Sequence, residues 1–141
     1  MNDFISVIED LILLFKELIQ IEKTKLEAAG KNRITHIEDC MNMEQAAILK
    51  LRGLEKKRET VQERMGFKGY TFKQILSETT GEDQERLKML FDTLSRQVRQ
   101  FQDTNESARS MIEMNLHMIN KAINNSKNGK VAGKAKWEGL L

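Results

Sequence analysis

The side chains that most often carry out chemistry are few in this sequence and are poorly placed to act together. His36 and Cys40 are one helical turn apart, but two ligands do not make a zinc site, which needs three or four. The sequence has no glycine-rich phosphate loop followed by Lys-Ser or Lys-Thr, no H-E-x-x-H and no Cys-x-x-Cys pair. Adjacent carboxylates such as Glu38-Asp39 are typical of solvated helix faces and of helix N-termini. We therefore expect no enzyme activity, no cofactor and no metal site.

The composition is that of a soluble, charged, helical chain. The 141 residues carry a net charge of +2, contain no proline, and 31% of them are charged, which favours long solvated helices over a turn-rich β fold. This near-neutral balance argues against an extended nucleic-acid binder. The longest apolar run, Leu11 to Phe15, is far too short to span a membrane, and the first residues lack the basic start of a secretory signal. With one cysteine and no internal disulfide, we expect a cytoplasmic protein that does not insert into membranes.

The first predicted helix spans residues 3–29, with Asn2 or Asp3 as its N-cap and Gly30 just beyond its end. Apolar residues occupy most of its circumference, which indicates packing against more than one neighbour. After Ile21 the pattern turns polar, so we expect that end of the helix to project beyond the core.

The second predicted helix spans residues 33–65 and ends at Gly66 in the C′ position. Two of the nine positions on its inward stripe are charged, which makes the seam weaker than that of an obligate coiled coil. The stripe comprises Ile37, Cys40, Glu44, Ala47, Leu51, Leu54, Arg58, Val61 and Met65.

Two capping signatures open the remaining helices. Thr71 followed by Gln74 predicts a capping box at the start of a short helix, and Thr79 with Glu82 offers the same pattern for a long final helix. That final helix runs for about 45 residues, or roughly 65 Å, which no small globular core matches. Its inward stripe steps by four and three through Leu87, Phe91, Leu94, Val98, Phe101, Asn105, Ala108, Ile112, Asn115, Ile119 and Ala122.

These elements predict an all-α fold, an elongated antiparallel bundle of three long helices plus one short helix with coiled-coil-like packing. Residues 1–126 form the helical domain. The periodicity is lost after Asn124, so we interpret residues 127–141 as a flexible, basic C-terminal tail.

The second half of the final helix has an unusually wide apolar face. At 100° per residue, the apolar arc covers about 100° between Leu87 and Phe101 but about 200° between Ala108 and Ile123. The excess is rich in methionine, whose flexible thioether adapts to partners of different shape, and an exposed apolar patch indicates an interaction site. The alternative is that these methionines fill gaps in the protein's own core.

Two asparagines interrupt the apolar seam of this helix. Asn105 and Asn115 lie at core-facing positions, where an asparagine usually fixes register or helix partner. Alternatively, their amides hydrogen-bond an incoming helix.

With these elements placed, the sequence resembles the FlgN family of bacterial flagellar export chaperones over about residues 5–123. The likeness lies in the Leu/Ile-rich first helix leading to Glu22 and Leu26-Glu27, in Leu49-Lys50-Leu51 and Leu54-Glu55-x-x-Arg58 before Met65-Gly66, and in Asn105 and Asn115.

The resemblance implies a small cytoplasmic helical chaperone that binds hook-associated proteins at the hook–filament junction. Such a chaperone keeps the cargo's helical terminal segment from premature assembly and delivers it to components of the flagellar export gate. The family's cargo contacts lie on the final helix and fall here on Ala108, Met111, Ile112, Met114, Asn115, Met118, Ile119 and Ile123. We expect an amphipathic cargo helix to lie along this face. The alternative is a structural or adaptor coiled coil that acts through homodimerisation.

Overall fold

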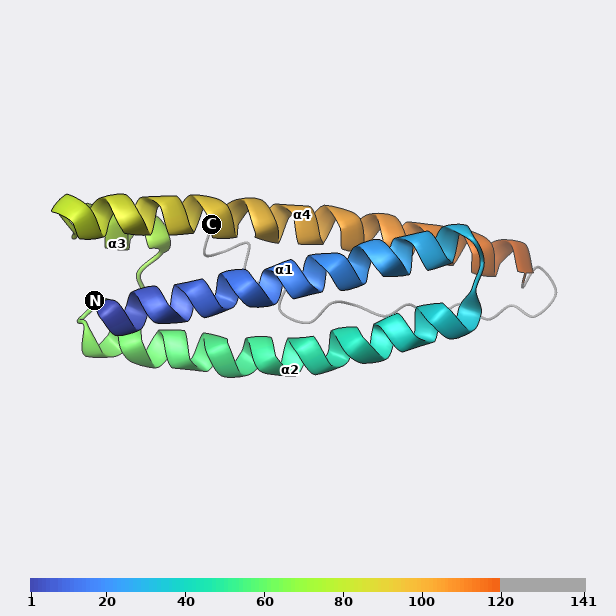
Figure 1. Ribbon diagram of the computed structural model, residues 1–141, viewed down its shortest axis with the longest axis horizontal. Helices are drawn as coiled ribbons and strands as arrows, with labels where there is room; N and C mark the ends of the chain where they lie inside the picture. The colour runs from blue at the N-terminus through green and yellow to red at the C-terminus, as the bar shows by residue number, and fades with distance from the viewer. Residues whose placement is uncertain (120–141) are drawn as a thin grey trace.

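The computed structural model describes the backbone of residues 1–119 and the side chains of residues 1–114. It contains α1 (Asn2–Gly30), α2 (Ile34–Arg64), α3 (Phe72–Ser77) and α4 (Gly81–Ile119), with no strand within these residues. The three long helices lie side by side and form an elongated rod (Figure 1). The predicted all-α bundle of three long helices and one short helix is confirmed. The predicted tail, the boundary at residue 126 and Ile123 lie outside the described residues.

The first helix is the centre of the bundle. α1 lies between α2 and α4 and packs along both, whereas α2 and α4 share no extended interface (Figure 1). α2 runs antiparallel to α1, and α4 then runs in the same direction as α1. The apolar circumference of α1 is explained by these two neighbours, as predicted. We call the end of the rod where α1 ends and α2 begins the distal end, and the opposite end the proximal end.

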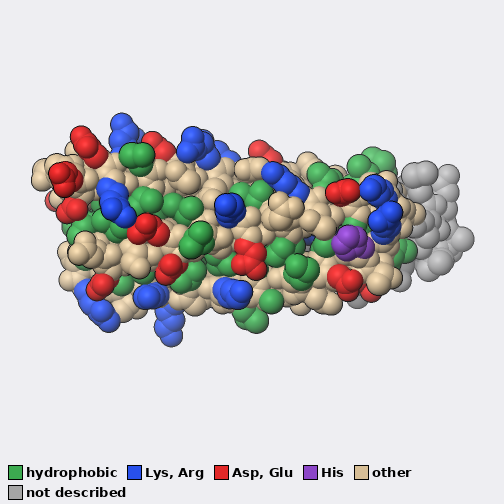
Figure 2. Space-filling view, in the orientation of Figure 1, with side chains coloured by type: hydrophobic (Ala, Val, Ile, Leu, Met, Phe, Trp, Pro, Cys, Tyr) green, Lys and Arg blue, Asp and Glu red, His purple; other side chains and the backbone are tan. Residues whose placement is uncertain are grey.

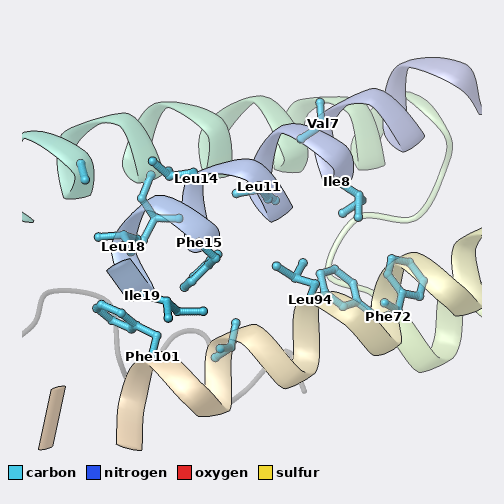
Figure 3. Packing of buried hydrophobic residues seen from close by; sticks show 14 of the residues in the cluster. Val7, Ile8, Leu11, Leu14, Phe15, Leu18, Ile19, Phe72, Leu94 and Phe101 are labelled. Atoms are coloured by element: carbon cyan, nitrogen blue, oxygen red, sulfur yellow. The ribbon is translucent and has the colours of Figure 1, made fainter. Parts of the chain in front are cut away.

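Aromatic side chains hold α4 to α1 and α3 along the proximal part of the rod. The Phe4 and Phe91 rings meet edge to face with centroids 6.1 Å apart, and Phe15 meets Phe101 in the same way at 5.9 Å. The Phe72 ring of α3 stacks on Phe91 at 4.3 Å. Figure 3 shows Phe15 and Phe101 beside Ile19 in this buried cluster, and Phe72 near Leu94. The inward stripe predicted for the final helix is buried from Leu87 to Ala108.

Two of the predicted helix ends form as the sequence indicates. Gly66 has φ 82°, which only glycine adopts readily, and the next amide, Phe67 N–H, donates to the Gln62 carbonyl at 2.8 Å. Thr71 Oγ1 accepts from the Gln74 amide at 3.3 Å, and Gln74 Oε1 accepts from the Thr71 amide at 2.9 Å. These two contacts complete the predicted capping box.

The ends of α1 differ from the prediction. Met1 is the N-cap and no side chain caps the helix, so Asn2 and Asp3 are helical residues. Gly30 is the last helical residue, not the residue beyond the end. The helix continues for one residue more than predicted. The left-handed conformation therefore falls after it, at Asn32, with φ 54°.

The second capping box is also absent. The Thr79 hydroxyl donates to the Leu76 carbonyl at 2.9 Å and makes no bond to the Glu82 amide among the described contacts. The Gln84 carboxamide instead donates to the Thr79 carbonyl at 2.8 Å and to the Leu76 carbonyl at 3.0 Å. The side chain of Gln84, within the first turns of α4, therefore fixes the loop before this helix.

Candidate functional site: the distal end of α4

Seven of the eight residues predicted to bind a partner lie in the described part of α4, and the four whose side chains are described lie on two faces of the helix. Ala108 is completely buried, Met111 and Ile112 are partly buried, and Met114 is 59% exposed. Asn115, Met118 and Ile119 continue α4, but their side chains lie outside the described residues. The part of the predicted site that the structure describes is therefore not one exposed patch.

The helical period separates the inward from the outward members of this set. With 100° per residue, Ala108 and Ile112 are about 40° apart on the side that faces the bundle, whereas Met114 is about 120° away from Ala108. Met111 lies between the two sides. Hydrophobic side chains lie among charged ones over the face of the rod that Figure 2 shows. Met111 and Met114 thus form an apolar outward face on an otherwise polar part of the rod.

A group of four polar side chains fills the interior beside this segment. Glu22 and Lys25 of α1 are 0% and 5% exposed, and Glu44 of α2 and Asn105 of α4 are each 9% exposed. Lys25 Nζ lies 2.7 Å from Glu44 Oε2 and 3.1 Å from Glu22 Oε1. The Asn105 amide donates to Glu22 Oε2 at 3.1 Å. We call these four residues the polar cluster; it joins all three long helices.

The polar cluster overturns one expectation from the sequence. The polar turn after Ile21 was expected to project beyond the core, but Glu22 and Lys25 are buried within it. The signal that reveals this is the spacing, because Leu18, Glu22, Lys25 and Ala29 continue the inward stripe in steps of four and three. The polar character of this turn suggested exposure, but Glu22 and Lys25 can be buried because each has a partner on a neighbouring helix.

The electrostatics of the polar cluster centre on Glu22. Burial raises the pKa of the Glu22 carboxyl above its ordinary value of 4.5, and the charge and hydrogen bond of Lys25 and the hydrogen bond of Asn105 oppose that rise. Burial also raises the pKa of the Cys40 thiol, which lies near the cluster on α2. With both carboxylates ionised, the cluster carries two negative charges and one positive charge.

Of the two roles predicted for Asn105, the structure supports the one within the protein's own bundle. Its side chain is buried and bonds Glu22, so it fixes α4 against α1 in the way that a buried asparagine fixes register. In this structure its amide is engaged within the bundle. For Asn115 both interpretations remain predictions.

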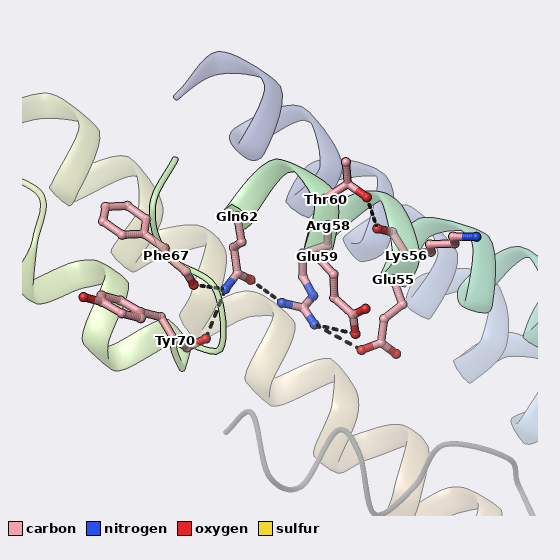
Figure 4. Close-up of polar contacts among 8 residues, drawn as sticks. All are labelled: Glu55, Lys56, Arg58, Glu59, Thr60, Gln62, Phe67 and Tyr70. Carbon is pink, nitrogen blue, oxygen red and sulfur yellow. Dashed lines mark hydrogen bonds and ion pairs between the residues drawn. The ribbon is translucent and has the colours of Figure 1, made fainter. Parts of the chain in front are cut away.

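A second polar group lies at the proximal end, away from the predicted site. The buried Arg58 guanidinium donates to Glu55 Oε1 at 3.1 Å and to Gln62 Oε1 (Figure 4). Gln62 in turn donates to the carbonyls of Phe67 and Tyr70 at 3.0 and 3.1 Å. This chain of contacts fixes the loop between α2 and α3, and it gives Arg58, which the α2 stripe placed inside, two polar partners.

Neither a metal centre nor a membrane span is evident among the described residues. No three side chains of His, Cys, Asp or Glu come together as a metal would require, and His36 is exposed while Cys40 is buried. None of the helices in the described part combines the length and apolar character needed to cross a bilayer.

Comparison with known proteins gives one match. The family model for the FlgN protein matches residues 1–135, which is nearly the whole chain. No curated protein and no solved structure matches. The chain belongs to the FlgN family, the family of flagellar export chaperones. It is thus a chaperone that binds flagellar cargo proteins, and its family is not known for catalysis.

Proposed function

We propose that this protein is a cytoplasmic chaperone that binds the helical terminal segment of hook-associated proteins, prevents their premature assembly and delivers them to the flagellar export gate. Membership of the FlgN family supports the general role. The observation that carries the specific proposal is the outward apolar face on α4, where Met114 is 59% exposed and Met111 is partly exposed.

An amphipathic cargo helix suits this face for two reasons. The face is part of one straight helix, so a second helix can lie along it and bury side chains at the i, i+3 and i+4 positions. Methionine side chains also adjust to cargo helices of different shape. Binding of this kind needs no chemical step and leaves release to the export machinery.

The test is co-purification of cargo from a flagellated host with the tagged protein, followed by mass spectrometry. Burying Met114 and the accessible part of Met111 contributes about 1–2 kcal/mol each, so Met111→Glu with Met114→Glu should weaken cargo binding at least about 30-fold. Met89→Glu is the matched control, because Met89 is 73% exposed on the proximal half of α4. Its cargo binding should equal that of the parent protein.

Two results would contradict the proposal. Equal cargo binding by the double variant and the control would mean that the outward face is not the cargo site. A tight homodimer in sedimentation that the double variant disperses, with no cargo retained by the parent, would favour the adaptor alternative. Circular dichroism should show unchanged helicity in both variants, because Met89 and Met114 are exposed and Met111 is only partly buried.

A further inference from the structure

The interior of the rod changes character between its proximal and distal parts. The apolar core of the described residues includes α4 only as far as Phe101. Beyond it, α4 contributes the amide of Asn105 and the methyl group of Ala108 to the interior. The residues of α1 and α2 that are buried toward the distal end are mostly charged or small: Ile21, Glu22, Lys25, Ala28, Ala29, Cys40, Glu44 and Ala47. Apolar packing therefore holds α4 mainly on the proximal side of Phe101.

The polar cluster takes the place of that packing at the distal end. Asn105 joins α4 to α1 through one hydrogen bond to Glu22 at 3.1 Å, and Lys25 joins α1 to α2 at 2.7 Å. When such groups separate, water replaces their hydrogen bonds and solvates their charges, whereas separated apolar side chains gain nothing from water. Opening the distal end should thus be easier than opening an apolar interior of the same size.

The predicted cargo site lies on this weakly held segment. Met111 and Met114 are accessible in the closed rod, but Ala108 is completely buried and Ile112 partly so. A partner helix that contacts all four residues can do so only after α4 has moved away from α1 and α2. The inward half of the predicted site thus lies next to the polar cluster.

We propose that the polar cluster keeps residues 105–114 of α4 separable from α1 and α2, and that cargo binds with this segment opened. Glu22, Lys25, Glu44 and Asn105 are then positioning residues, which set how often the inward face becomes available. The inference rests on the proposed function, because it describes how the same site takes up its helix. An apolar interior at this end would hold the site closed.

The first test replaces the polar cluster by apolar side chains in one variant, Glu22→Leu, Lys25→Met, Glu44→Leu and Asn105→Leu. Such replacements usually leave stability unchanged or raise it. We expect amide hydrogen exchange in residues 105–114 to slow about tenfold and the affinity for a cargo-helix peptide to fall about tenfold, because the affinity scales with the population of the open state. The peptide is the synthetic C-terminal helix of the hook-associated protein retained in the co-purification.

A second variant acts in the opposite direction and does not depend on repacking the interior. Asn105→Asp keeps the size of the side chain but places a carboxylate where the amide donates to Glu22. At pH 8 the two carboxylates repel, so exchange in residues 105–114 and peptide affinity should both rise, by about tenfold if the open state is a minor one. Exchange in α1 and α2 at the proximal end should stay as in the parent.

Gly53→Ala provides the matched control. Gly53 is an exposed position of α2 with open space around it, so alanine should stabilise the helix without touching the polar cluster. Its exchange in residues 105–114 and its peptide affinity should equal those of the parent. Equally slowed exchange in this control would mean that the segment opens only by global unfolding, which overturns the inference.

The remaining outcomes separate the two proposals. Parent-like peptide affinity in both cluster variants, alongside altered exchange, would show that cargo binds the closed rod and would overturn only this inference. Parent-like exchange in both variants would overturn it as well. No peptide binding by the parent would overturn the proposed function together with the inference that rests on it.

Discussion

Removal of the Lys25 ammonium tests how much the buried ion pairs contribute to the stability of the bundle. Its Nζ lies 2.7 Å from Glu44 Oε2 and 3.1 Å from Glu22 Oε1, and all three side chains are nearly buried. At an effective dielectric constant of about 20, each attraction amounts to about 5–6 kcal/mol before desolvation is counted. Desolvation offsets much of that, and loss of one partner from a buried pair costs about 3–5 kcal/mol. Lys25→Met should therefore remove a large share of a stability of about 5–15 kcal/mol.

The pH dependence of this loss identifies its cause. The pKa of Glu22 is raised in the folded state, so the folded chain holds that proton more tightly than the unfolded chain. The stability that this gives is present below pH 4.5 and is lost as the pH rises through the folded pKa. Because Lys25 lowers the pKa of Glu22, its removal raises that pKa further. The penalty for Lys25→Met should thus be largest at neutral pH and shrink in acid.

The assay is urea unfolding followed by circular dichroism at pH 7 and at pH 4.5. Lys16→Met is the matched control, because Lys16 is an exposed lysine of the same helix, and its stability should stay within about 0.5 kcal/mol of the parent. Adding Glu22→Gln and Glu44→Gln to Lys25→Met should restore much of the lost stability at pH 7. A Lys25→Met variant as stable as the control, or a penalty that does not change with pH, would refute the role of Lys25 as the shared counter-ion.

Three further substitutions concern two glycines of α2 and its C-terminal turn, and the proximal polar group. Gly66→Ala should lower the free energy of unfolding by about 1–2 kcal/mol because φ is 82° there, whereas Gly53→Ala should raise it by up to about 1 kcal/mol; a Gly66 variant as stable as the parent would contradict the strain argument. Gln62→Leu should lower the free energy of unfolding by about 1–3 kcal/mol, because the carbonyls of Phe67 and Tyr70 lose the donor that they share. An unchanged midpoint of thermal unfolding would contradict this prediction.

Much of the fold could be predicted from spacing alone. The step of four and three from Leu87 to Ala108 identified every buried position on that stripe, because a helix that packs along its whole length shows its contact face in the sequence. Gly66 and the Thr71 capping box were also identified, since each depends on a few adjacent residues. The ends of α1 were missed, because Asn2 and Asp3 are good caps that the chain does not use.

The candidate site was less accessible to sequence reasoning. The inward stripe correctly placed Ala108 inside the bundle, but the wide apolar arc grouped Ala108 with the exposed Met114 as one partner-binding face. The division between them depends on where α1 lies relative to α4. The partners of Glu22 and Lys25 were likewise hidden, because Asn105 lies 83 residues beyond Glu22 and Glu44 lies 19 residues beyond Lys25.

The central position of α1 has a consequence for the order in which the helices fold during synthesis. Its contacts with α2 join residues as close in sequence as 19 positions, such as Lys25 and Glu44, whereas its contacts with α4 join residues such as Ile12 and Gln97, 85 positions apart. Short loops close sooner than long ones, so a hairpin of the first two helices should assemble while the rest is still emerging from the ribosome. The final helix, α4, is therefore the last of the three long helices to dock during synthesis.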